Sequence, residues 1–295
     1  MTEPKVKLIE YFNEHWYKLE LESGEVVYYP STTTKLSVTA KPFLAHWRGD
    51  IGNREADLRM QEAADRGSRL HHAWSVLCQG GAVIYQNPKR PAYSWEEIES
   101  LRVEYLDLLA ILQNQEEQVQ IWKLSRWLEA LKPTRIISEQ IVYSHANQRA
   151  GTCDNFLAVE EGEYPINGKA PLKLEKGLYI ADLKTGKVVD DDAFLQTSDY
   201  AHMLVEMAYS GVDWASALIK EFGEPKGSLI IHTSAQTRSG ISGLATLLRT
   251  KDEMAQDYED MQYVAKIWDR KNKDAKPTIF EFPSLITMKK EPATI

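Results

Sequence analysis

The residue pair best suited to chemistry is Asp182 and Lys184, which follow the apolar run 177–181 in a segment expected to form a β-strand. Residues two apart on a strand point to the same face, so a carboxylate and an amine leave this strand together. Acidic-x-Lys triplets occur five times in the chain, but only this one ends an apolar strand. The pair can be a salt bridge at a sheet edge, or it can serve hydrolytic chemistry.

A second carboxylate, Asp154, lies in the preceding predicted strand, 151–159. Antiparallel pairing of the two strands could bring Asp154 close to Asp182, and like charges at that distance raise each other's pKa unless a cation lies between them. Mg²⁺ or Mn²⁺ takes carboxylate and carbonyl oxygens, so both aspartates and the Leu183 carbonyl could form a partial shell. Lys184 could then position a water molecule or help to deprotonate it. The alternative is a turn aspartate with no metal.

Two helical segments could complete such a site. His71 and His72 face directions about 100° apart on a helix, so only one can point inward, where a neutral imidazole could bind the metal. Gln196 and Tyr200 are four residues apart and share a helix face, from which they could hold a phosphate or a sugar. The alternatives are an ordinary surface histidine and simple packing of the glutamine and tyrosine.

Periodicity and turn residues predict the elements that must position these side chains. A β-hairpin is expected first, then two long helical blocks, then a region of strands interrupted by a polar excursion. Ser31 and Thr32–34 can cap the first helix, Ser94 the second block and Asp190–192 a later helix. The expected segments are strands 15–21, 25–29, 135–144, 151–159, 177–185 and 227–234, helices 41–77 (with breaks at Gly52 and Gly67), 94–131, 190–210 and 244–269, and the excursion 160–176.

Composition sets the class of protein. The 295 residues are 43% hydrophobic and 26% charged, which is typical of a folded domain and excludes collagen-like and disordered chains. Two cysteines are too few for a disulfide framework, a four-cysteine zinc site or an iron–sulfur cluster. No apolar stretch is long enough to span a bilayer and the N-terminus lacks a signal peptide, so we expect a cytoplasmic protein without membrane contact.

The order of elements predicts an α+β fold, with a helical N-terminal half packed against a small mixed sheet. We expect one domain over 1–295 without internal repeats. Its parts would be a helical segment, 30–132, that carries His71, a core, 133–235, and a C-terminal helix and tail, 236–295.

Taken together, these motifs resemble one nuclease family. Gly-x-x-x-His ends at His71, Gly-x-x-Asp ends at Asp154, Asp-x-Lys ends at Lys184, and Gln-x-x-x-Tyr ends at Tyr200. This order is similar to that of the RecB-like branch of the PD-(D/E)xK nuclease superfamily, over about residues 32–231. The segment PSTTTKLSVTAKPFLAHW (30–47) resembles the phage and bacterial exonucleases of this branch and the mitochondrial genome maintenance exonucleases.

The resemblance implies a restriction-endonuclease-like α-β-β-β-α-β core and assigns roles to residues. The ligands implied for one or two Mg²⁺ or Mn²⁺ ions are His71, Asp154, Asp182 and the Leu183 carbonyl. The residues implied in catalysis are Asp154, Asp182, Lys184, Gln196, Tyr200 and Glu139, which lies at the start of the first core strand. The residues implied in substrate binding are Thr33, Thr34, Gln196 and Tyr200. Asp182 follows Asp154 by 28 positions, a long separation for this branch, which we attribute to an insertion at 160–176.

The expected function is therefore Mg²⁺- or Mn²⁺-dependent hydrolysis of DNA, by an exonuclease acting on ends or single strands in replication, recombination or repair. The expected setting is the cytoplasm of a bacterial or phage-infected cell, with a recombination or single-strand-binding protein as a possible partner. The alternatives are a catalytically silent DNA-binding accessory protein, a structure-specific endonuclease, and a hydrolase of small phosphorylated substrates. No Walker A motif is present, so no attached helicase is expected.

The net charge of −8 argues at first against a nucleic-acid partner. Binding depends on the local field, however, and metal ions neutralise an acidic site. Basic residues gather near the C-terminus, where they could contact DNA or simply form a solvated helix face: Arg238, Arg249, Lys251, Lys266, Arg270, Lys271, Lys273 and Lys276. We expect modest, salt-sensitive affinity for duplex DNA.

Overall fold

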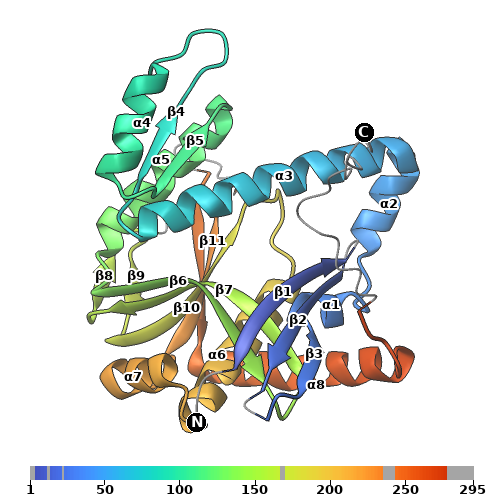
Figure 1. The fold of residues 1–295 in the computed structure, drawn as a ribbon. Coiled ribbons are helices and arrows are strands. Elements are labelled where there is room, and N and C mark those ends of the chain that lie inside the picture. The colour runs from blue at the N-terminus through green and yellow to red at the C-terminus, as the bar shows by residue number, and fades with distance from the viewer. Residues whose placement is uncertain (1–3, 12–13, 22, 167–169, 235–242, 278–295) are drawn as a thin grey trace, which may run out of the picture.

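A five-stranded mixed sheet forms the centre of the computed structural model, which describes residues 4–11, 14–21, 23–166, 170–234 and 243–277 (Figure 1). The strand order is β12-β11-β10-β7-β6, in which β10 and β11 are parallel and the other neighbours are antiparallel. The strands are β6 (Arg135–Ser144), β7 (Arg149–Val159), β10 (Gly177–Lys184), β11 (Gly227–His232) and β12 (Ala245–Thr250). The chain is thus of mixed α+β class, as expected.

Helices cover both faces of this sheet, which is why its central strands are buried almost throughout. On one face lie α3 (Asn53–Cys78) and α5 (Gln115–Leu131), and on the other lie α6 (Asp192–Tyr209), α7 (Asp213–Phe222) and α8 (Lys251–Lys271). Leu183 and Leu157 point to the α3 side, whereas Ile180 and Phe156 point to the α6 side. Alternation along β7 and β10 therefore builds two cores on one sheet.

A three-stranded N-terminal sheet packs on the α6 side. It consists of β1 (Lys5–Tyr11), β2 (Glu14–Glu20) and β3 (Val26–Pro30), and its Tyr17 and Leu19 join the core there. The predicted hairpin corresponds to β2 and β3, while β1 is an additional strand that pairs with β2. Ser31 then caps the short helix α1 (Thr32–Leu36) by accepting a hydrogen bond from the Thr34 backbone N–H.

Buried charges fix α1 to the rest of the fold. Arg149 of β7 and Asp199 of α6 form an ion pair in which both side chains are almost fully buried, and the Thr32 hydroxyl donates to the same carboxylate. Lys35, also buried, pairs with Asp269 of α8 at 2.9 Å. Because a buried charge is tolerated only with a close partner, these contacts define where α1 lies.

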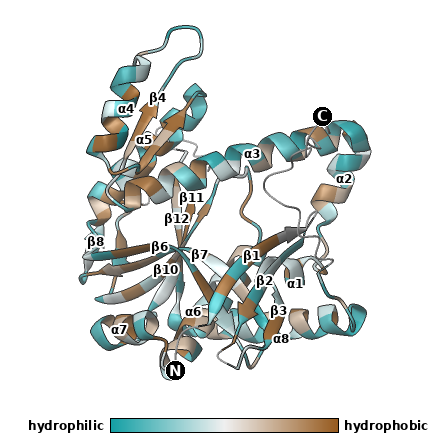
Figure 2. Ribbon diagram, in the orientation of Figure 1, coloured by the Kyte–Doolittle hydropathy of each residue, from teal (hydrophilic) through white to brown (hydrophobic). Residues whose placement is uncertain are grey.

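The two long predicted helical blocks are each divided. The first contains α2 (Pro42–Ile51) and α3, with a break at Gly52 (φ +83°) as predicted, but Gly67 lies inside α3. The second contains α4 (Trp95–Glu104), which Ser94 caps as predicted, and then a short strand, β5 (Leu109–Leu112), before α5. The helical prediction for 105–112 was wrong because β5 pairs with β4 (Ala82–Tyr85), a strand not predicted. Figure 2 shows both as hydrophobic segments.

Two other segments refine the predicted order. The helix expected to begin at Leu244 begins at Lys251 instead, because 245–250 pairs with β11 as the edge strand β12. The excursion 160–176 carries a small hairpin of β8 (Gly162–Tyr164) and β9 (Leu172–Leu174), so β7 and β10 remain direct neighbours. Among the described residues, no helix is both long enough and apolar enough to cross a membrane.

Candidate metal and catalytic site

The two aspartates face each other where β7 and β10 separate. The antiparallel ladder ends at the pair Ala181–Asn155, and the next positions in the same register are Asp182 and Asp154. The predicted antiparallel neighbours are therefore present despite the long separation in sequence. Asp182 is 3% exposed, so two carboxylates meet in a place with little water to screen them.

His71 and Glu139 complete a cluster around Asp154. One ligand atom from each of these three residues lies within 4.8 Å of the other two. Glu139 is opposite Asp154 in the β6–β7 register and has φ +53°, which interrupts the ladder at this pair. A non-glycine residue in this conformation costs about 1–3 kcal/mol and persists where the surroundings impose it.

Asp154 is held ionised. Its Oδ2 lies 3.3 Å from His71 Nδ1 and accepts a hydrogen bond of 2.8 Å from the Leu183 N–H. Burial opposes the charge on Asp154, but His71, Lys184 and this N–H together lower its pKa. Burial likewise opposes the charged imidazole of His71, but the carboxylate of Asp154 outweighs it and raises the pKa of His71 to about 9. The hydrogen bond from Leu183 to this site comes from its N–H, whereas the group predicted to bind metal was its carbonyl.

The pKa values of the other two carboxyl groups, on Asp182 and Glu139, are raised. Burial raises the pKa of Asp182, and the nearby ammonium of Lys184 offsets this only in part. Burial and the Asp154 charge raise the pKa of Glu139 to about 7. Three carboxyl groups therefore lie close to one imidazole and one lysine. A bound divalent cation would stabilise the negative charge of these carboxyl groups.

A hydrogen-bonded chain leads from Lys184 into the helix α6. Lys184 Nζ lies 2.8 Å from Asp182 Oδ2 and donates to Gln196 Oε1 at 3.2 Å, and Gln196 Nε2 donates to the Tyr200 hydroxyl at 2.9 Å. Burial disfavours the ammonium, but Asp182 and Asp154 outweigh this effect and raise the pKa of Lys184. Lys184 is therefore protonated at neutral pH, and it acts as a hydrogen-bond donor and not as a base.

The donor set fits a hard divalent metal. Carboxylate oxygens and an imidazole nitrogen are ligands that Mg²⁺ and Mn²⁺ accept. Asp182 Oδ2 is buried and lies 2.8 Å from Lys184 Nζ, so this ammonium group is its close charged partner.

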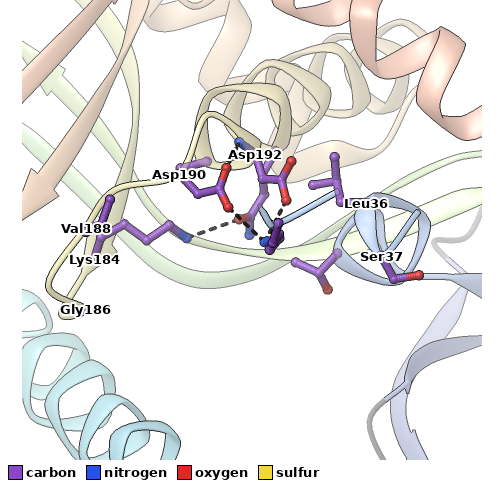
Figure 3. Close-up of a pocket in the computed structure, with 11 residues that line it drawn as sticks. Leu36, Ser37, Lys184, Gly186, Val188, Asp190 and Asp192 are labelled. Atoms are coloured by element: carbon purple, nitrogen blue, oxygen red, sulfur yellow. Dashed lines mark hydrogen bonds and ion pairs between the residues drawn. The ribbon is translucent and has the colours of Figure 1, made fainter. Parts of the chain in front are cut away.

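A cavity of about 330 Å³ adjoins Lys184 and Gln196 (Figure 3). It lies between α1, the loop after β10 and the start of α6. Thr33 lines it, as a substrate-binding residue would, together with residues that were not predicted. The complete lining is Thr33, Leu36, Ser37, Lys41, Lys184, Gly186, Val188, Asp190, Asp192, Ala193 and Gln196.

Other predicted site residues have different positions. Thr34 is buried, and its hydroxyl donates to the His15 carbonyl, so it anchors α1 and does not line the cavity. Tyr200 is buried beneath Gln196 and is likewise absent from the cavity wall. His72 is exposed, and His71 is the histidine that faces the carboxylates, as the resemblance implied.

Sequence reasoning missed three charged residues at the cavity. Lys41 Nζ lies 3.1 Å from Asp190 and 2.8 Å from Asp192, and all three residues line the cavity. Figure 3 labels the two aspartates. The aspartates were identified only as a helix start, and no local signal links them to a lysine about 150 residues earlier. These ion pairs exist only because the tertiary structure brings Lys41 next to Asp190 and Asp192.

The described basic residues near the C-terminus fall into a paired group and an exposed group. Arg249 pairs with Asp257 and stacks on Phe194, and Lys251 pairs with Glu224. Those at the end of α8 and just after it are exposed, and Arg238 lies outside the described residues. The charge pattern by itself therefore favours neither DNA contact nor a solvated face.

Gly151 lies against the ring of Tyr200, the residue whose hydroxyl accepts a hydrogen bond from Gln196. A substitution at Gly151 therefore tests this contact. A Cβ at this position would lie 2.2 Å from Cε1 of the Tyr200 ring, so Gly151→Ala must displace the tyrosine. We expect a loss of about 1–3 kcal/mol in the free energy of unfolding, together with a lower kcat. Chemical denaturation measures the first effect. Gly49→Ala, where nothing lies within 4 Å, is the matched control and should not destabilise the protein; equal stability of both variants would contradict the packing.

The arrangement combines a cluster able to bind a metal, a fixed ammonium group and an adjoining cavity. These are the parts needed to position water against a phosphate ester and to stabilise negative charge. No protein-family model and no curated protein matches this chain.

Proposed function

We propose that this protein is a Mg²⁺- or Mn²⁺-dependent nuclease that hydrolyses phosphodiester bonds of DNA, as an exonuclease acting on ends or single strands. The observation that carries the proposal is the meeting of Asp154, Asp182 and Lys184 at one point between β7 and β10, with His71 of α3 against it. The order α5, β6, β7, β10, α6, β11 also supports a restriction-endonuclease-like α-β-β-β-α-β core.

Each residue has a distinct part in this proposal. His71, Glu139 and Asp154 would hold the metal, with Asp182 beside them; the metal would activate water and neutralise charge on the phosphate. Lys184 donates a hydrogen bond to the water or to a phosphate oxygen and stabilises the developing negative charge. Gln196 fixes the ammonium by accepting its hydrogen bond, and Tyr200 fixes the amide.

Cleavage assays test this function directly. Oligonucleotides labelled at either the 5′ or the 3′ end, as single and double strands, and circular DNA are incubated with Mg²⁺, Mn²⁺ or EDTA. Metal-dependent shortening from an end of linear DNA, with circular DNA intact, is the expected result. Metal-dependent cleavage of the circle would favour an endonuclease. DNA binding that resists EDTA, without any product, would contradict the proposal and support an accessory protein.

The proton on His71 predicts how metal binding depends on pH. Because a metal binds neutral imidazole, an ion must displace the proton of a histidine whose pKa is about 9. The apparent Mn²⁺ affinity should therefore rise roughly tenfold per pH unit between about pH 7 and 9, and more steeply below, where Glu139 also binds a proton. Calorimetry in buffers of different ionisation enthalpy measures the protons released. An affinity that is flat with pH would contradict His71 as a ligand.

A further inference from the structure

The cavity beside Lys184 differs from the metal centre because its charges are already paired. Lys41 is held between Asp190 and Asp192, and Lys184 is paired with Asp182. With two carboxylates around one lysine, the outer wall carries no spare positive charge for a phosphate group. A ligand in this cavity should therefore be polar but uncharged.

The rest of the wall suits the flat, partly apolar body of a base. Leu36 and Ala193 supply buried apolar surface, and Val188 lies on the loop after β10. Thr33 on α1 and Ser37, the residue that follows α1, are both exposed. The Thr33 hydroxyl shares a hydrogen bond with Ser31, and both hydroxyl groups have capacity left for a base edge or a sugar. The carboxylates of Asp190 and Asp192 can accept hydrogen bonds from exocyclic amines.

Size and position limit the occupant further. The volume of about 330 Å³ is at the low end for ligand pockets, which suits one nucleoside. Lys184 and Gln196 belong both to this wall and to the hydrogen-bonded chain at the aspartates. A nucleoside in the cavity would therefore lie beside Lys184, whose ammonium group is 2.8 Å from the Asp182 carboxylate.

We propose that this cavity is the binding site for one unpaired nucleoside next to the scissile phosphate. The inference rests on the proposed nuclease function and extends it, since it assigns recognition to Thr33, Ser37 and the Lys41–Asp190–Asp192 group. A base of single-stranded DNA can enter directly, whereas a base in a duplex must first leave its partner strand.

The experiment combines abasic substrates with a filled cavity. Single-stranded oligonucleotides carry one abasic site at successive positions around the cleaved bond, and kcat/KM is measured for the wild type and for the double variant Thr33→Leu/Ser37→Leu. In the wild type, one position should lower kcat/KM about tenfold. The filled variant should lose a similar factor on the intact strand, and the abasic site should then cause no further loss.

Ala45→Leu is the matched control, because Ala45 is exposed on α2 and does not line the cavity. It should retain wild-type kinetics, and all variants should bind Mn²⁺ equally. If the wild type cleaves DNA but no abasic position matters, or if the filled variant retains its rate, the nucleoside site is overturned while the nuclease function stands. If the wild type cleaves no DNA with either metal, the proposed function fails and this inference fails with it.

Discussion

Asp182→Asn is expected to reduce kcat for DNA cleavage by about three orders of magnitude while the protein remains folded. The substitution keeps the size of a buried side chain, removes its negative charge and replaces one acceptor oxygen with an NH₂ donor. Charge stabilisation by a metal and its ligands contributes several kcal/mol to such reactions, and each 1.36 kcal/mol is about tenfold in rate. End-labelled DNA in excess Mn²⁺ gives kcat, and circular dichroism reports the fold.

The chain supplies a matched control for this substitution. Asp274 and Lys276 form another Asp-x-Lys triplet, but both are exposed and lie after α8. Asp274→Asn should leave kcat unchanged. Comparable activity of Asp182→Asn and the wild type would show that the pair at β10 is a structural salt bridge, which is the simpler explanation of the motif.

Lys184→Met is expected to lower kcat by about 10²–10³-fold, the range seen when one donor to a developing negative charge is removed. Metal affinity should be equal or higher, because an ammonium group near the cluster repels a cation. Since Asp182 and Asp154 raise the pKa of Lys184 above its ordinary value, the wild-type lysine stays charged across neutral pH. Lys184→Arg should therefore retain more activity than Lys184→Met.

Two measurements separate this role from a structural one. Calorimetric Mn²⁺ titration shows whether the metal site survives in Lys184→Met, and the pH–rate profile shows whether the lysine acts as a base. A role as base predicts that wild-type activity rises with pH through the lysine pKa, whereas a donor role predicts that it falls there. Lys220→Met, at an exposed residue of α7, is the control, and a similar loss of activity in that variant would contradict a specific role for Lys184.

Part of this fold follows from local sequence alone. The strands β6, β7 and β10, the helix α6 and the caps at Ser31 and Ser94 were predicted within about two residues, because each carries strong periodicity or a capping residue. β5 and β12 were predicted as helix. Both are short apolar or mixed runs beside real helices, and only their partner strands β4 and β11 decide the conformation.

The site divides in the same way. Asp154, Asp182, Lys184 and His71 could be named from residue type, spacing and a resemblance in motif order. Glu139 was also named from the resemblance, as a catalytic residue. Its place beside His71 and Asp154 depends on the β6–β7 register, because a single-residue slip would turn it to the other side of the sheet.

The sequence by itself determined which side chains leave the same face of β10 and which elements carry the candidate ligands, because these depend on the two- and 3.6-residue periods of the backbone. Only the tertiary structure decided that Asp182 faces Asp154 across a 28-residue separation, and that Lys41 joins Asp190 and Asp192 at the cavity wall. The physical reason is that strand register and ion pairs between distant segments depend on how those segments pack. The local sequence pattern of a segment does not specify which distant segment it will contact.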